Sequence, residues 1–269
     1  MTAGFVLLAQ SDPARSGEAF SLRAGALELE ARIEPLIDTA YGLESTESEL
    51  SIKTPLKARD GYDVDHFRRL LPPHPVEVGD TWPVDPKALL PFLRQLLPGA
   101  TDALHHGFGS APGAFACLRW ADADAAEIVL RVHAEFRFHV GSLATEAWLT
   151  PAQFRGRLRL DRRAGTVSAF ELLLPDARAN VDVNVRQDDH GIADIGRIAR
   201  MEVRSGAVAD DGDHGGLSLA GAEALLAQSF YPSAALEWPE LPDALAQARA
   251  TGKPLHVLVM FGSLLDESC

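Results

Sequence analysis

Cysteine is almost absent from this chain of 269 residues, which contains only Cys117 and Cys269. Two cysteines are too few for a disulfide scaffold, and they do not have the spacing of zinc ligands. The composition therefore implies neither a secreted disulfide framework nor a structural zinc site. A single disulfide between Cys117 and Cys269 is compatible with the sequence but is not favoured.

Long apolar runs and excess basic charge are also missing. No run reaches the roughly 18 to 20 apolar residues that a transmembrane helix needs. The N-terminal segment 1–9 has a short apolar core but no basic residue before it, so it is a poor signal peptide. We therefore expect a soluble protein without a membrane span, with the cytoplasm favoured. The net charge of −13 argues against nucleic acid and anionic membranes as partners.

Alternating apolar and polar residues predict a sheet. They occur over Ala26–Ile33, over 128–140, and on both sides of the turn at 161–165, which predicts a hairpin. A further strand is expected at Val181, Val183 and Val185. We predict a flexible arm over residues 1–21 and a β-rich domain over 22–205.

Three helices are expected, one within the β-rich domain and two after it. Asp85 and Pro86 begin one helix, which ends before Pro98. After a Gly- and Asp-rich linker at 206–217, Ser218 caps a second helix, and Pro242 starts a third whose Leu241 and Leu245 should face a core. A buried strand is expected at 255–261. The fold class is α+β, and helix, turn, strand and thiol loop over 218–269 match the first part of a thioredoxin-like domain.

Several polar groups could be binding sites, and each has a simpler interpretation. His133, Glu135 and His139 share a strand face and could ligate a metal, but a solvated face is favoured. Arginines at 155, 157 and 159 could meet an anionic partner, but a solvent-exposed edge is favoured. The acidic stretch 60–65 is interpreted as a turn. A solvated loop is preferred to a metal site for Asp210, Asp211, Asp213 and His214, and Cys117 is expected to be a small buried hydrophobe.

The C-terminal stretch carries the most specific pattern. Gly262 to Cys269 resembles the segment that runs Gly-x-Leu-x-Asp-x-Ser-Cys in the selenoprotein N family, where selenocysteine and Gly follow. Other segments resemble that family in the same order: 27–36, 70–82, 111–118, Arg131-Val-His-Ala-Glu-Phe136, 151–156, 180–183 and 194–202. Because UGA encodes selenocysteine and is normally read as stop, the resemblance implies a chain truncated one residue before its selenocysteine.

This resemblance implies a thiol/selenol oxidoreductase with a Cys-selenocysteine redox pair in the complete protein. The catalytic residues would be Cys269, as partner of the selenocysteine expected next to it, with Ser268 bordering the motif and Asp266 orienting or protonating. A loop acid that accepts backbone amides is the alternative for Asp266. The substrate would be a protein or small-molecule disulfide or a peroxide, with no other cofactor. The chain as given should have little activity.

One departure from the family concerns calcium. The animal members carry a helix-loop-helix calcium site before the segment that resembles 27–36. The residues preceding that segment here contain no such acidic loop, so calcium is not expected. A rival hypothesis from another functional class is a partner-binding or regulatory module without catalysis of its own.

Overall fold

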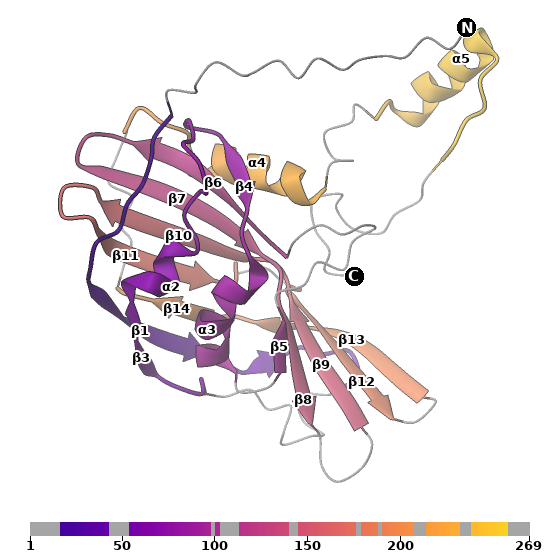
Figure 1. The fold of residues 1–269 in the computed structure, drawn as a ribbon. Helices are drawn as coiled ribbons and strands as arrows, with labels where there is room; N and C mark the ends of the chain where they lie inside the picture. Colours follow the sequence, from indigo (N-terminus) through magenta and orange to yellow (C-terminus); the bar gives the residue numbers. More distant parts are fainter. Residues whose placement is uncertain are drawn as a thin grey trace, which may run out of the picture.

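The structure, a computed structural model, describes residues 17–42, 54–97, 100–102, 113–139, 145–175, 179–187, 190–206, 214–231 and 238–257. Two antiparallel sheets dominate it (Figure 1). In order across the larger sheet, the eight strands are β3 (Arg59–Asp63), β1 (Ala26–Ile33), β14 (Met201–Arg204), β11 (Thr166–Leu173), β10 (Phe154–Asp161), β7 (Ala125–Val132), β6 (Ala114–Ala121) and β4 (Thr81–Pro83). The six strands of the other are β2 (Leu36–Ile37), β13 (His190–Ile198), β12 (Val181–Gln187), β9 (Thr145–Pro151), β8 (Glu135–His139) and β5 (Ala100–Asp102).

The same chain segments supply both sheets. The chain passes from one sheet to the other at 34–35, 133–134, 152–153 and 199–200, and we call the line formed by these crossings the bend. Strands that are neighbours in one sheet continue into neighbouring strands of the other. The alternation over 128–140 that predicted one long strand is therefore divided between β7 and β8. The strand at Ala26–Ile33 and the hairpin of β10 and β11 are confirmed. Within the stretch 60–65, expected to be a turn, residues 60–63 instead belong to β3 and pair with β1, and residues 64–65 begin a helix.

Asn180 holds the bend together. Its side-chain amide accepts a hydrogen bond from the Ile198 amide at 2.9 Å and donates one to the Ile198 carbonyl at 2.8 Å. Asn180 has no exposed surface. Buried backbone groups need hydrogen-bond partners, and the Asn180 side chain supplies them to the N–H and C=O of Ile198, where regular strand pairing is interrupted.

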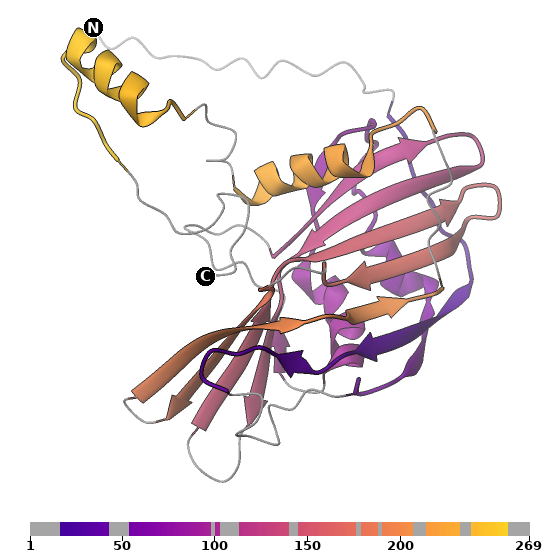
Figure 2. The same ribbon diagram turned by 180° about the vertical axis from the view of Figure 1, so that it is seen from behind.

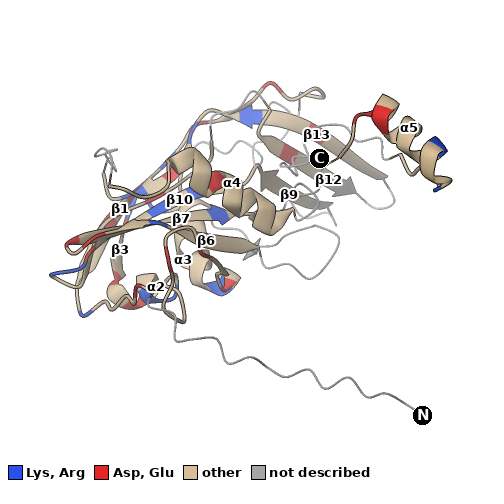
Figure 3. Ribbon diagram, turned by 90° about the horizontal axis from the view of Figure 1, so that it is seen from above, with Lys and Arg blue, Asp and Glu red and all other residues tan. Residues whose placement is uncertain are grey.

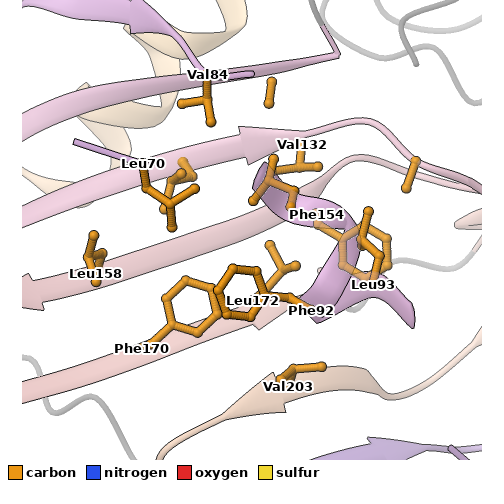
Figure 4. Packing of buried hydrophobic residues seen from close by; sticks show 14 of the residues in the cluster. Leu70, Val84, Phe92, Leu93, Val132, Phe154, Leu158, Phe170, Leu172 and Val203 are labelled. Atoms are coloured by element: carbon orange, nitrogen blue, oxygen red, sulfur yellow. The ribbon is translucent and has the colours of Figure 1, made fainter. Parts of the chain in front are cut away.

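The main core lies between one face of the eight-stranded sheet and the helices α2 (Val64–Arg68) and α3 (Pro86–Leu96). The Asp85 side chain accepts a hydrogen bond from the Lys87 amide, as expected for the predicted helix start. The ring of Phe92 lies 4.7 Å from that of Phe170 between centroids, and Figure 4 shows both among the buried side chains of the sheet. Such burial is the main source of folding stability.

The opposite face of this sheet is covered by α4 (Leu219–Phe230) (Figure 2). Ser218 caps it as predicted, with its hydroxyl accepting a hydrogen bond from the Gly221 amide at 3.0 Å. Ala222 and Leu226 of α4 pack against Cys117 and Val129 of the sheet. The thioredoxin-like assignment of 218–269 and the linker at 206–217 stay predictions, but α4 itself packs on β6 and β7.

The next helix, α5 (Leu241–Thr251), ends at Gly252, which adopts the left-handed conformation with φ of 64°. Its expected core contacts are not present in the described residues, because Leu241 and Leu245 are 52% and 38% exposed. Residues 255–257 are also exposed and do not form the predicted strand, whose positions 258–261 lie outside the described residues. No described helix is both long and apolar enough to cross a membrane.

Candidate functional site

The residues predicted to carry the redox chemistry, Cys269, Ser268 and Asp266, lie outside the described residues. Their roles therefore stay predictions. Asp210, Asp211 and Asp213, for which a solvated loop is preferred to a metal site, also lie outside the described residues.

Cys117, on β6, is the described thiol. Its side chain has no exposed surface, so the prediction of a buried small hydrophobe is confirmed. Burial, with a smaller contribution from the negative charge of Asp80, raises the pKa of this thiol to about 11. A thiol with such a pKa is a poor nucleophile at neutral pH. Because Cys117 has no exposed surface, a disulfide with Cys269 would require the packing around Cys117 to open.

The arginines at 155, 157 and 159 do not form a solvent-exposed edge, which corrects the sequence-based interpretation. Their strand, β10, lies between β7 and β11 inside the sheet. The neighbouring strand supplies Glu127, whose side chain is 0% exposed and accepts hydrogen bonds from Arg119, Arg157 and Arg159 at 2.7, 2.9 and 2.7 Å. We call these four residues the charge network. Figure 3 shows basic residues on β10 close to α4.

The charge network controls ionisation on this face. Burial alone would raise the pKa of Glu127, but hydrogen bonds from Arg157, Arg159 and Arg119 hold the pKa of this carboxyl below its usual range. Glu171 lies 3.5 Å from Arg157, and here burial prevails and raises the carboxyl pKa. Two carboxylates on one sheet face thus have pKa values shifted in opposite directions.

The charge network also fixes the path of the chain into α4. Arg119 donates from Nε to the Leu217 carbonyl at 3.0 Å, and the Leu217 amide donates to the Arg119 carbonyl at 2.9 Å. The His214 ring stacks on Trp120 at a centroid distance of 3.9 Å. A Cβ added to Gly216 would lie 2.4 Å from the Trp120 side chain, so only glycine fits there. Residues 214–217 are therefore closely packed against β6.

A second cluster of polar side chains lies at the bend, beside the end of α4. His133 and Glu135 are buried, which corrects the expectation of a solvated face, and Glu135 accepts a hydrogen bond from Arg137 at 2.7 Å. The bend also has Gln153, which donates to the Tyr231 hydroxyl at 2.5 Å and accepts from Arg131. The Arg131 guanidinium lies over the Phe230 and Tyr231 rings, 5.6 and 5.5 Å from their centroids.

Metal ligation is not supported by what is described. Among the described side chains, no group of three His, Cys, Asp or Glu residues is placed to hold a metal ion. The side chain of His139, the third member of the suggested set, is not among them. What the arrangement can do chemically is hold α4, together with residues 214–217 before it and Tyr231 at its end, in one orientation through ion pairs, hydrogen bonds and cation–π contacts.

Sequence reasoning missed Glu127 and Arg119. A signal existed, because Glu127 interrupts the largely apolar stretch Ala125–Val132 and arginines recur at alternate positions 155, 157 and 159 of a later strand. Register decides the contact: Arg159 pairs with Glu127 across β10 and β7. The pattern of apolar and polar residues does not give the register in which two strands pair, so Glu127 could not be matched to its arginine partners from the sequence.

Comparison with known proteins identifies relatives. Selenoprotein N of Danio rerio is 26% identical over 308 aligned residues, which cover 90% of this chain and 55% of that protein. Selenoprotein N of Mus musculus is 26% identical over 258 residues, covering 76% of this chain and 46% of the relative. The Homo sapiens protein is 27% identical over 258 residues, with coverages of 76% and 44%.

The chain thus spans about half the length of the curated relatives it matches. No protein-family model matches it, and no solved structure does.

Proposed function

Because this chain is a homologue of selenoprotein N over most of its length, we propose that it is part of a thiol/selenol oxidoreductase in which Cys269 supplies the reactive sulfur. The observation that carries the proposal is the order of the matching segments, which ends in Ser268 and Cys269. The burial of Cys117 supports it, because that sulfur is inaccessible.

In this proposal Cys269 is the resolving thiol of a pair. A neighbouring selenol, ionised at neutral pH, would supply the atom that attacks a disulfide. Cys269 would then break the covalent link to the substrate by attack of its thiolate, so that the substrate leaves as two thiols and the protein pair is oxidised by two electrons. Ser268 would border the pair, and Asp266 would orient or protonate the leaving sulfur. A thiol donor must reduce the pair for the next cycle.

The test begins with the codon that follows Cys269 in the gene. We expect UGA followed by Gly and an in-frame continuation. The extended protein, produced with selenocysteine at that codon, should reduce a small disulfide faster than free cysteine does. C269S should abolish the gain, and C117S should retain it. A codon of UAA or UAG, or equal rates for C269S and the unsubstituted protein, would contradict the proposal.

A second function, a partner-binding module, is favoured by a separate observation. The described thiol is buried, whereas the outer face of the six-stranded sheet carries exposed apolar side chains, including Ile37 and Ile195. If binding is the main role, C269S in the extended protein should leave partner capture intact. If redox exchange is the main role, capture should depend on Cys269 and should proceed through mixed disulfides.

A further inference from the structure

The chain around the proposed reactive sulfur carries charge of one sign. Asp266 and Glu267 precede Cys269 by three and two residues. The last basic side chains before Cys269 are Lys253 and His256, so none of the twelve residues immediately before this cysteine is basic. Two acidic residues next to the sulfur are therefore not offset by a basic neighbour in the sequence.

The short spacing limits the distance between these charges and the sulfur in every conformation. One residue spans at most about 3.6 Å of chain, so the Cα atom of Glu267 lies within about 7 Å of that of Cys269, and the Cα atom of Asp266 lies within about 11 Å. The screening length at physiological ionic strength is about 8 Å. Both carboxylates therefore act on a charged group that approaches the sulfur, even without direct contact.

The rest of the molecule does not reverse this sign. Residues 218–269 contain six acidic side chains but one arginine and one lysine. The arginines of the charge network are paired with Glu127 and have side chains at most 12% exposed, so they do not form an exposed positive patch. With a net charge of −13, the long-range field of the protein has the same sign as the local charge at Cys269.

We propose that the redox pair reacts preferentially with neutral or positively charged disulfides and donor thiols and discriminates against anionic ones. The inference rests on the proposed function, and it identifies Glu267 as a specificity-determining residue. In each turnover the substrate disulfide takes up two electrons and leaves as two thiols, while the protein pair is oxidised. A carboxylate on the substrate is repelled by Asp266 and Glu267 during this exchange, whereas an ammonium group is attracted.

This selectivity also narrows the class of protein substrate. A disulfide flanked by Lys or Arg side chains should be reduced faster than one flanked by Asp or Glu. The same argument applies to the thiol that reduces the oxidised pair, which should be neutral or cationic.

The test compares three disulfides of similar size: cystamine, a dication; hydroxyethyl disulfide, which is neutral; and dithiodipropionate, a dianion. Their reduction by the extended protein is measured at low and at high salt. E267K reverses the charge of a residue that has no role in the proposed chemistry, and E267Q removes it. Comparing each variant with the unsubstituted protein, substrate by substrate, cancels the intrinsic reactivity of the disulfides.

We expect E267K to lower the rate with cystamine and to raise the rate with dithiodipropionate, each by about two- to fivefold at low salt, with E267Q between. At about 1 M salt, where the screening length is about 3 Å, these differences should disappear. A change shared by the neutral disulfide reports an altered pKa of the thiol and is divided out. E28K is the control for net charge, because the Glu28 side chain is 70% exposed on β1, and it should leave the ratio of cationic to anionic rates unchanged.

The outcomes separate the two proposals. Equal responses of the three disulfides to E267K, or an equal change of the ratio in E28K, would overturn the charge selectivity while leaving the oxidoreductase in place. Failure of the extended protein to reduce any of the three disulfides would contradict the proposed function and would remove this inference with it.

Discussion

The two sheets are built from consecutive pieces of the same chain, yet their environments differ. The eight-stranded sheet has α2 and α3 on one face and α4 on the other, and its polar side chains are buried in the charge network. The far end of the six-stranded sheet has Ile192 and Ile195 at 47% and 49% exposure. The bend thus lets one set of strands form both a covered scaffold and an accessible surface.

The largest effect is expected from E127Q in the covered sheet. Removing this carboxylate charge leaves three buried guanidinium groups poorly compensated. We expect the free energy of unfolding to fall by about 3 to 5 kcal/mol. Urea unfolding measures this loss of stability. E223Q is the control, because Glu223 pairs with Arg155 on a partly exposed surface, and this substitution should lower the free energy of unfolding by less than about 1 kcal/mol. Similar losses for the two variants would contradict the distinction between buried and surface pairs.

The bend that separates the sheets should be next in sensitivity. N180A removes both side-chain hydrogen bonds to the Ile198 backbone and leaves that buried N–H and C=O without their partner. We expect a loss of about 2 to 3 kcal/mol in the free energy of unfolding. N184A, on strand β12 that follows Asn180, is the control because Asn184 is only partly buried, and it should cost less than about 1 kcal/mol. An undisturbed midpoint for N180A would show that the bend does not depend on this side chain.

The two carboxylates with opposite shifts give a smaller effect that depends on pH. Glu127 has a lowered pKa, so its contribution is present above its ordinary value of 4.5 and is lost as pH falls through the folded-state pKa. Glu171 has a raised pKa, so its ionised form disfavours folding at neutral pH, and protonation relieves this as pH falls. We expect E171Q to be at least as stable as the unsubstituted protein at neutral pH, within about 1 kcal/mol.

The pH series is measured by urea unfolding between neutral and acidic pH. The deficit of E127Q should shrink as the buffer becomes more acidic than its carboxyl pKa, and any advantage of E171Q should also vanish in acid. A deficit of E127Q that is constant across the series would mean that the ionised carboxylate is not the stabilising form.

The smallest effect is expected on the accessible sheet end. I195T keeps the β-branched shape and removes apolar surface from a side chain that is half exposed. The free energy of unfolding should change by less than about 0.5 kcal/mol. Thermal unfolding measures this change. V183T on β12 is the control, because Val183 is fully buried and its substitution should lower the unfolding midpoint more. Equal shifts in the two midpoints would mean that both faces of this sheet are buried.

Local pattern determined many of the elements. Alternation located β1 and the hairpin of β10 and β11, Asp85 and Ser218 marked helix starts, and Gly252 marked the end of α5. These signals act over a few residues, through side-chain periodicity and through hydrogen bonds to the first helical amides. The resemblance to selenoprotein N likewise rests on short segments and their order along the chain, which are properties of the sequence alone.

Burial of the polar residues was decided by tertiary structure. The alternation around His133 and Glu135 indicates which side chains share a face, but whether that face meets water depends on which other parts of the chain pack on it. Likewise, Arg157 and Arg159 of β10 belong to the charge network because register places Arg159 opposite Glu127 and because β10 lies in the interior of the sheet. Sequence patterns are local, whereas pairing register and the covering of a face depend on residues distant in the chain, and this is why only the tertiary structure separated the covered sheet from the accessible one.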